Sequence, residues 1–199
     1  AIQSVGGNMI HISTDYVFDG LSDRPYTPED PVNPQNIYGK SKWEGEKIMR
    51  SLQMNRSLII RTSWVYSEFG SNFVKTIIRL AKERESLKVV VDQIGSPTYA
   101  ADLARAILEI LPRLEHKNVK TYHYSNEGIC SWFDFAKEII KMACFGCEIN
   151  PIVSLEYPQL ANRPNFSVLN KTKIKQDFSI DIPCWKDSLR RFFLNNSTN

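Results

Sequence analysis

The most informative shortage in this sequence is glycine. Only nine of the 199 residues are glycine, and no GxGxxG or GxxGxxG run occurs anywhere in the chain. Dinucleotide-binding folds need such a run after their first strand, because only glycine lets the backbone approach a pyrophosphate at a helix N-terminus. Gly6 and Gly7 precede an apolar run instead of following one. We therefore expect the glycine-rich loop of any dinucleotide site to lie outside these 199 residues.

Cysteine is also scarce. The chain has four cysteines, too few for a disulfide scaffold at this length, so a reduced cytoplasmic setting is the simplest interpretation. Two of them form the sequence CFGC at 144–147, but no second pair of ligands accompanies it, and we expect no zinc or other metal site.

Charge clusters and long apolar runs are missing as well. The net charge is only +3 and no block of lysine and arginine occurs, so we expect no nucleic-acid partner. No apolar run approaches the roughly 18 residues of a spanning helix, so we expect no membrane partner. The remaining composition is that of an ordinary globular domain.

Apolar periodicity alternates strands with helices along the chain. We expect strands at 9–14, 57–66, 87–92 and 120–126, and helices at 37–52, 71–85, 100–114, 131–143 and 185–194. Such alternation predicts an α/β fold, with parallel strands in one layer and crossover helices beside it. From Pro151 to the last helix we expect irregular structure.

The helix at 37–52 carries Tyr38 and Lys42, which share a face because they are four residues apart. A free tyrosine has a pKa near 10 and is a poor acid at neutral pH. A lysine ammonium about 4 Å away, at an effective dielectric of about 20, favours a phenolate by roughly 4 kcal/mol. The pair is therefore a candidate proton donor for a carbonyl, although the same spacing often only decorates a helix.

The strand at 9–14 ends in polar residues beside this pair. Ligands of open α/β sheets bind beyond the carboxyl ends of strands, so we expect Thr14 to hydrogen-bond a substrate carbonyl. His11, Ser13 and Asp15 superficially suggest a hydrolase triad. Alternate residues of a strand lie roughly 7 Å apart in a row, however, and cannot form a hydrogen-bonded chain. We expect His11 to be a satisfied core histidine.

Five consecutive blocks make the resemblance specific: STDYVFDG, YTPEDPVNPQNIYGKSKWEGEK, IIRTSWVYSEFGSNFVKTIIRLAKERE, VVVDQIGSPTYAADLA and RPNFSVLNKTKI. Together they resemble the dTDP-4-dehydrorhamnose reductase family of the extended short-chain dehydrogenase/reductase superfamily. The Tyr-x-x-x-Lys motif marks only the superfamily, whereas RTSWVY followed by DQIGSPT marks the reductases.

The resemblance implies the C-terminal part of a Rossmann-type parallel sheet plus a small α/β substrate-binding domain. Residues 1–112 would form a partial Rossmann domain, lacking its first βαβ units and carrying substrate-domain insertions, and 113–199 mainly the substrate-binding domain. The family uses NADPH or NADH to reduce dTDP-4-dehydro-6-deoxy-L-mannose to dTDP-L-rhamnose, a precursor of cell-surface polysaccharide. The implied partner is thus a dTDP-sugar.

The resemblance also implies roles for single residues. Tyr38 would donate the proton, and Lys42 would hold the nicotinamide ribose and assist Tyr38. Thr14 would bind the sugar carbonyl or hydroxyl. Ser13 and Val65 would lie near the nicotinamide.

Three further residues would contact the substrate. Asp15 and Trp64 would line the sugar pocket, although a tryptophan after a strand often serves only packing. Arg163 is our own candidate for the diphosphate, because a guanidinium suits bidentate binding of phosphate.

Two other readings remain open. Another nucleotide-sugar epimerase or dehydratase of the superfamily would fit the tyrosine and lysine equally well. A non-catalytic relative, similar to the regulatory subunit of methionine adenosyltransferase, would keep the fold without the activity. We also expect these 199 residues alone to be inactive. The strand at 9–14 should be an exposed sheet edge, which makes a homodimer plausible.

Overall fold

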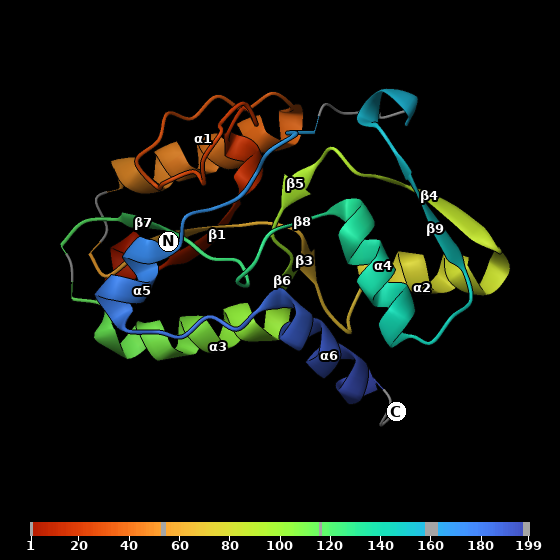
Figure 1. Ribbon diagram of the computed structural model, residues 1–199. Coiled ribbons are helices and arrows are strands. Elements are labelled where there is room, and N and C mark those ends of the chain that lie inside the picture. Colours follow the sequence, from red (N-terminus) through yellow and green to blue (C-terminus); the bar gives the residue numbers. More distant parts are fainter. Residues whose placement is uncertain (1, 53–54, 116, 158–162, 197–199) are drawn as a thin grey trace.

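The computed structural model describes residues 2–52, 55–115, 117–157 and 163–196. A three-stranded parallel sheet forms the middle layer of the larger part, in the order β1-β2-β7 (Figure 1). Its strands are β1 (Ile10–Thr14), β2 (Leu58–Thr62) and β7 (Lys120–His123). Ile12 lies opposite Ile60, which lies opposite Tyr122. Among the described residues β1 pairs only with β2, so the expected edge position of this strand is confirmed.

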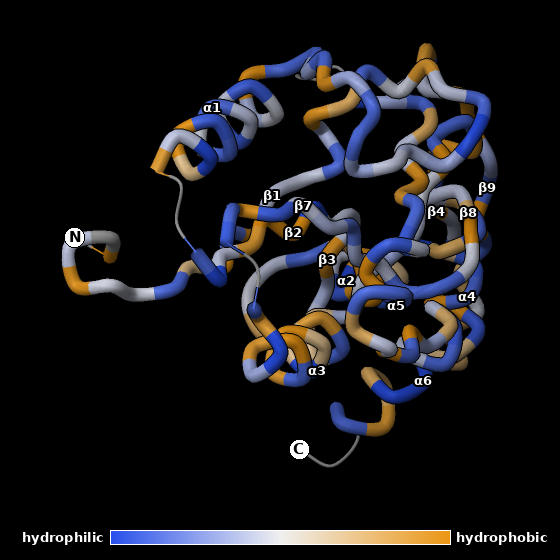
Figure 2. The backbone as a smooth tube through the Cα atoms, turned by 90° about the vertical axis from the view of Figure 1, so that its left-hand side faces the viewer, coloured by the Kyte–Doolittle hydropathy of each residue, from blue (hydrophilic) through white to orange (hydrophobic). Residues whose placement is uncertain are grey.

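Helices cover both faces of this sheet. In Figure 1, α1 (Ile37–Ser51) lies on one side, and α3 (Ala100–Ile110) and α5 (Thr172–Phe178) lie on the other. The core between the sheet and these last two helices is apolar. It contains Leu58, Ile60, Leu103, Ala106, Ile110, Tyr122, Ile174 and Phe178. Figure 2 shows that the helices on the two faces differ in hydropathy: α3 is largely hydrophobic, whereas α1 is more hydrophilic.

A second group of elements packs around another parallel pair of strands. β4 (Ser86–Val90) pairs with β9 (Glu148–Ile152), and both lie beside α2 (Phe73–Glu83) and α4 (Trp132–Met142). The helix α6 (Trp185–Asn196) completes this group. Its aromatic core includes Tyr66, Tyr99, Phe135, Trp185 and Phe192.

Short pairings link the two groups. β3 (Val65–Tyr66) pairs with β6 (Thr98–Tyr99), and β5 (Ile94–Gly95) pairs with β8 (Cys130–Ser131). The remaining elements are single 3-10 turns: η1 (Gln3–Val5), η2 (Asp15–Val17), η3 (Leu111–Arg113) and η4 (Ser154–Glu156).

The α/β class expected from the sequence is confirmed, but three details were wrong. The segment at 87–92 does not join the main sheet, because β4 pairs with β9 instead. The strand expected at 57–66 is broken at Trp64, whose φ of 49° turns the chain out of β2. The region after Pro151 contains α5 as well as α6. Periodicity gives strand positions but not strand partners, which long-range packing decides.

The domain division at residue 112 stays a prediction. Elements from both sides of that position contribute to each group: β7 and α5 belong to the main sheet layers, while α2 and β4 belong to the second group.

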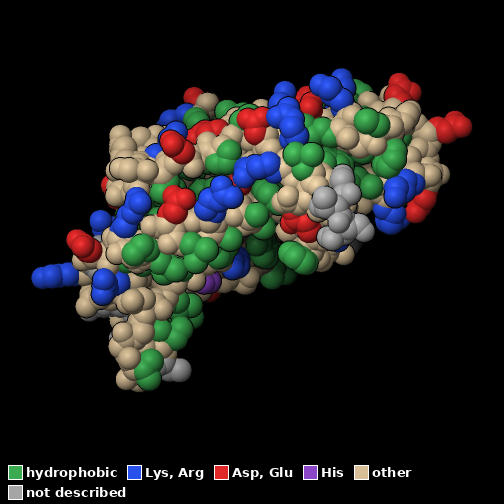
Figure 3. All heavy atoms as spheres, turned by 90° about the horizontal axis from the view of Figure 1, so that it is seen from below, with side chains coloured by type: hydrophobic (Ala, Val, Ile, Leu, Met, Phe, Trp, Pro, Cys, Tyr) green, Lys and Arg blue, Asp and Glu red, His purple; other side chains and the backbone are tan. Residues whose placement is uncertain are grey.

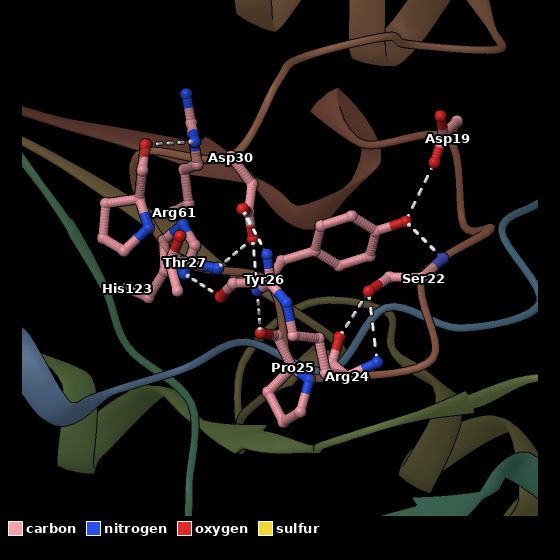
Figure 4. A network of polar contacts seen from close by, with 10 residues as sticks. Asp19, Ser22, Arg24, Pro25, Tyr26, Thr27, Asp30, Arg61 and His123 are labelled. Carbon is pink, nitrogen blue, oxygen red and sulfur yellow. Dashed lines mark hydrogen bonds and ion pairs between the residues drawn. The ribbon is translucent and has the colours of Figure 1, made fainter.

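The proline-rich loop between β1 and α1 is held by a polar network (Figure 4). The Tyr26 hydroxyl donates to Asp19 at 2.9 Å and accepts from the backbone of Gly20 and Ser22. Asp30 forms a bidentate ion pair with Arg24 at 2.9 and 2.8 Å. The loop is therefore fixed where it leads into α1.

The same loop is joined to the sheet. The Tyr26 carbonyl lies 3.0 Å from Nδ1 of His123 on β7, and Arg61 of β2 donates to the Pro28 carbonyl at 3.4 Å. Burial, together with the charge of Arg61, lowers the pKa of His123 to about 3, so this imidazole is neutral. The loop is thereby anchored to two strands of the sheet.

The surface seen in Figure 3 carries basic and acidic side chains interspersed. No helix of the described residues is long and apolar enough to cross a membrane.

Candidate active site

A cavity of about 460 Å³ opens at the carboxyl end of β1. All eight site residues expected from the sequence line it or its rim: Ser13, Thr14, Asp15, Tyr38, Lys42, Trp64, Val65 and Arg163. The cavity also has four lining residues that the sequence did not single out: Ile12, Tyr16, Thr62 and Trp132. The structure thus brings Arg163 together with the end of β1, from which it is far removed in the sequence.

The first turn of α1 presents Tyr38 to this cavity. Asn36 caps the helix by accepting a hydrogen bond from the Gly39 amide at 2.8 Å. Tyr38 is 54% exposed, and its ring meets that of Tyr16 edge to face, with centroids 5.8 Å apart. The phenol is therefore accessible and has a fixed aromatic neighbour.

One turn later, Lys42 is tied to the end of the sheet. Its Nζ donates to the carbonyl of Ile12 on β1 at 2.6 Å. A close approach of α1 to η2 makes this possible, because a Cβ at Gly39 would lie only 2.1 Å from the carbonyl oxygen of Tyr16. On the same face of α1, the nearest atoms to a Cβ at Gly45 would belong to His11.

His11 of β1 lies close enough to Lys42 to be affected by its charge. Burial and the positive charge of Lys42 lower its pKa, against the opposing charge of Glu46. The expectation of a satisfied histidine was wrong for one atom, since the buried Nε2 has no hydrogen-bond partner among the described residues. A neutral imidazole is consistent with that environment, because an unpaired buried charge would cost far more.

The end of β1 places two polar side chains in the cavity. The Thr14 hydroxyl donates to Oδ1 of Asp15 at 3.1 Å and accepts from the Tyr16 amide at 3.2 Å. Asp15 is only 2% exposed. Burial raises the pKa of its carboxyl to about 6, against hydrogen bonds from Ser167 and Thr14 that favour the charged form. This carboxyl can therefore exchange a proton near neutral pH.

Asp15 also affects the tyrosine beside it. Burial and the charge of Asp15 raise the pKa of Tyr16 to about 12, although the charge of Arg163 works in the opposite direction. Tyr16 therefore stays protonated and can serve the cavity as a hydrogen-bond donor.

A buried ion pair holds α1 against the strands that carry the site. Glu46 of α1 has no exposed surface, and it accepts two hydrogen bonds from Arg61 of β2 at 2.9 and 2.8 Å. It also accepts from Ser13 at 2.6 Å and from Arg50 at 3.1 Å. Burial raises the pKa of Glu46, but the hydrogen bonds and charge of Arg61, with the bonds from Ser13 and Arg50, outweigh it and lower the pKa. The pair joins α1 to both neighbouring strands.

Sequence reasoning missed this pair, although two signals were present. Arg61 interrupts the apolar run SLIIRTS, and a charge in a buried strand needs a partner. Glu46 lies four residues after Lys42, on the face of α1 that turns toward the sheet. Each observation identified one residue of the pair, but the sequence did not show that these two residues are in contact.

A second cavity, of about 630 Å³, lies against α2, β4 and the start of α4. Phe73, Leu87, Val89 and Gln93 are among its lining residues. Trp132 and Arg163 line both this cavity and the one at β1. The basic side chain expected to bind a diphosphate is thus shared by two cavities.

No group of three histidine, cysteine, aspartate or glutamate side chains in the described ranges could hold a metal ion. The four cysteines are all unpaired.

Comparison with known families gives a match over nearly the whole chain. A family model described as "RmlD substrate binding domain" matches residues 1–198. Among curated proteins, the spore coat polysaccharide biosynthesis protein SpsK of Bacillus subtilis is 43% identical over 194 residues, which are 98% of this chain and 66% of that protein. The dTDP-4-dehydrorhamnose reductase of Escherichia coli K12 is 39% identical over 199 residues, with 96% and 66% covered. The chain thus spans about two thirds of the length of these relatives.

Solved structures agree with this match. A dTDP-4-dehydrorhamnose reductase from Bacillus anthracis, solved in complex with NADP, superposes with a TM-score of 0.92 at 43% identity, covering 98% of this chain and 68% of that one. A dTDP-glucose 4,6-dehydratase from the same organism, in complex with NAD, has a TM-score of 0.82 at 17% identity, with 100% and 64% covered. The second likeness shows the fold alone.

Proposed function

Because the chain belongs to the RmlD substrate binding domain family, we propose that it carries the substrate site of an NAD(P)H-dependent dTDP-4-dehydrorhamnose reductase, which forms dTDP-L-rhamnose for cell-surface polysaccharide. One observation carries the proposal: Thr14, Tyr38 and Lys42, which the family resemblance selected, surround a single cavity together with Arg163, our own candidate for the diphosphate. The relatives of known name support the same reaction.

The residues at the mouth of the cavity fit a nicotinamide ring. Ile12 and Val65 are apolar side chains that line the cavity yet remain 36% and 46% exposed. They lie beside Tyr38 and Lys42, whose hydroxyl and ammonium suit the hydroxyls of a ribose. When bound there, NADPH or NADH would supply the hydride for the reaction. Ser13 contributes its backbone to this surface, because its hydroxyl already donates a hydrogen bond to Glu46.

The proposed work of the chain is to hold the keto sugar and protonate it. Thr14 orients the 4-keto oxygen by a hydrogen bond, and Tyr38 donates the proton that converts this oxygen to a hydroxyl. Lys42, fixed to the Ile12 carbonyl, binds the ribose and stabilises the negative charge that Tyr38 acquires. Asp15 and Trp64 contact the sugar.

The rest of the substrate would extend into the second cavity. Arg163 borders both cavities, which suits a diphosphate lying between a sugar on one side and a nucleoside on the other. Apolar side chains such as Phe73 and Leu87 offer a surface for a thymine ring. A cytoplasmic location belongs to the same proposal, since nucleotide sugars are made there and the cysteines are unpaired.

The test measures the consumption of NADPH on addition of dTDP-4-dehydrorhamnose. The assay uses the protein in its natural length. Loss of a positioned general acid lowers the rate about 10²–10⁴-fold, so we expect this loss in Tyr38→Phe while binding of dTDP-L-rhamnose is retained. Turnover that survives in Tyr38→Phe would contradict the assigned role. Failure of the unaltered protein to bind any dTDP-sugar would contradict the proposed function itself.

A further inference from the structure

Two stacked tryptophans form one wall of the cavity at β1, and one of them, Trp132, also borders the second cavity. The indole rings of Trp64 and Trp132 are stacked, with centroids 3.6 Å apart and planes inclined by 10°. Phe73 packs against Trp132 at 4.5 Å. Both indoles line the sugar cavity, and Trp132 also lines the second cavity. The wall is therefore continuous from one cavity to the other.

The backbone of Trp64 adopts a conformation that residues with a Cβ disfavour, so its surroundings must hold the indole in place. Trp64 has a φ of 49°, in the left-handed region that costs a residue with a Cβ about 1–2 kcal/mol. Such conformations persist only where the surroundings impose them, and they gather at ligand sites. Here the surroundings are Trp132 and the bare backbone of Gly95, where a Cβ would lie 2.7 Å from the Trp64 ring.

The cavity at β1 is divided in its chemistry. Polar side chains come from the end of β1 and the first turns of α1, including Thr14, Asp15 and Tyr38. The side formed by the turn after β2 and the start of α4 is aromatic, because it consists of Trp64 and Trp132. A hexose placed here turns its polar substituents toward β1 and needs an apolar substituent to face the indoles.

We propose that the stacked Trp64–Trp132 pair is the specificity element for a 6-deoxy sugar, with Trp132 positioning the Trp64 indole against the C5 methyl group. This inference rests on the proposed function. A methyl group next to C4 would contact the wall when the 4-keto oxygen meets Thr14 and Tyr38. An ordinary hexose carries a hydroxymethyl group instead, and its hydroxyl would be left without a partner against the indoles.

Binding of two product analogues tests this assignment. dTDP-L-rhamnose and dTDP-L-mannose differ only in the hydroxyl at C6, so their ratio of dissociation constants isolates that group. One such difference in a pocket changes affinity about 10–200-fold, and we expect a preference for the rhamnose compound of at least about 10-fold in the unaltered protein. Calorimetric titration of both ligands gives the ratio.

The variants separate positioning from folding. In Trp132→Ala the Trp64 indole loses its stacking partner, and we expect the ratio to fall to within about threefold of unity. Trp132→Phe keeps an aromatic face and should restore most of the preference. Trp43→Phe is the matched control, because Trp43 lies outside both cavities and its loss should leave the ratio unchanged.

A spectroscopic signature reports the stack directly. Two stacked indoles couple electronically, and they produce an exciton couplet in far-ultraviolet circular dichroism when their transition dipoles are twisted about the stacking axis. Trp64→Phe and Trp132→Phe should each abolish the couplet, and Trp43→Phe should keep it. Binding of dTDP-L-rhamnose to the unaltered protein should change the couplet, because the ligand touches one face of the pair.

The outcomes distinguish a failure of the specificity role from a failure of the proposed function. Equal affinity for the two sugars in the unaltered protein, or a ratio that persists in a folded Trp132→Ala variant, would overturn the specificity role and leave the proposed function standing. An unaltered protein that binds neither compound would overturn both. Loss of the preference in Trp132→Ala, with recovery in Trp132→Phe, would support the inference.

Discussion

Removing Arg61 should expose how much the buried ion pair contributes to stability. The variant Arg61→Met keeps an apolar stem between the rings of Phe18 and Trp43, which lie 5.1 and 6.0 Å from the guanidinium. It removes two hydrogen bonds to Glu46, whose side chain has no exposed surface. Loss of one partner from a buried pair costs about 3–5 kcal/mol, because the other charge stays buried. We expect that loss in the free energy of unfolding, measured by urea denaturation at neutral pH.

The pH dependence of the loss identifies its cause. In the unaltered protein the pKa of Glu46 lies below its ordinary value of 4.5, so the stabilisation is present above that value and is lost as the pH falls through the folded-state pKa. In Arg61→Met the bonds from Ser13 and Arg50 remain, but the largest influence that opposes burial is gone, and the pKa of Glu46 should rise above the unfolded value. The penalty then shrinks as the carboxylate takes up a proton, so the deficit should be smaller at about pH 5 than at about pH 7.

Glu46→Gln is the matched control. It leaves Arg61, which is 1% exposed, without a countercharge but introduces no titrating group. Its deficit should therefore be nearly constant between about pH 7 and pH 5. The double variant Glu46→Leu, Arg61→Met should cost less than the two single changes together, because no charge is left unpaired. A deficit below about 1 kcal/mol in Arg61→Met, or one independent of pH, would refute the account of this pair.

Three further expectations concern the same region. Asp15→Asn should raise the stability at pH 7 by about 2–3 kcal/mol, because burial raises the pKa of Asp15 to about 6. The gain should shrink as the pH falls through about 6 and vanish near about pH 3, where both the folded and the unfolded carboxyl are protonated. Equal stability of both proteins in urea at pH 7 would contradict this expectation. Gly39→Ala should lower the melting temperature, because the new Cβ would clash with the carbonyl of Tyr16. Gly45→Ala is the control and should keep or raise the melting temperature, because its Cβ would lie 3.4 Å from the nearest atom. The reverse order in a thermal scan would disprove the proposed contact. If the unpaired edge of β1 supports a homodimer, light scattering should show a mass that rises with concentration, and a constant monomer mass would argue against it.

Much of the fold followed from local pattern. The helices expected at 71–85 and 131–143 are α2 and α4, which Asn72 and Ser131 cap. Capping depends on the first turn alone, so sequence is sufficient to predict it. The fragments STD and YGKSK also pointed to the cavity, because the end of a parallel strand and the first turn of a helix have fixed places in an α/β layer.

Pairing and burial were decided at longer range. The strand at 86–90 looked like a member of the main sheet, but its partner is β9, some 60 residues later. Nothing local specifies that choice, since an apolar strand presents the same backbone groups to any neighbour. The break at Trp64 was hidden for the same reason: its left-handed conformation depends on Trp132 and Gly95, which lie beside it only in the folded chain.

Spacing along the chain was enough to identify the groups that could perform chemistry here: a tyrosine and a lysine one helical turn apart, and a threonine at the end of a strand. The helix and strand repeats convert such spacing directly into the direction of each side chain. The surroundings of these groups, in contrast, follow from tertiary packing. Burial sets the pKa of Asp15, Arg61 compensates Glu46, and two distant indoles stack into one wall. Burial and contact are properties of the packed chain, so no residue carries them before it folds.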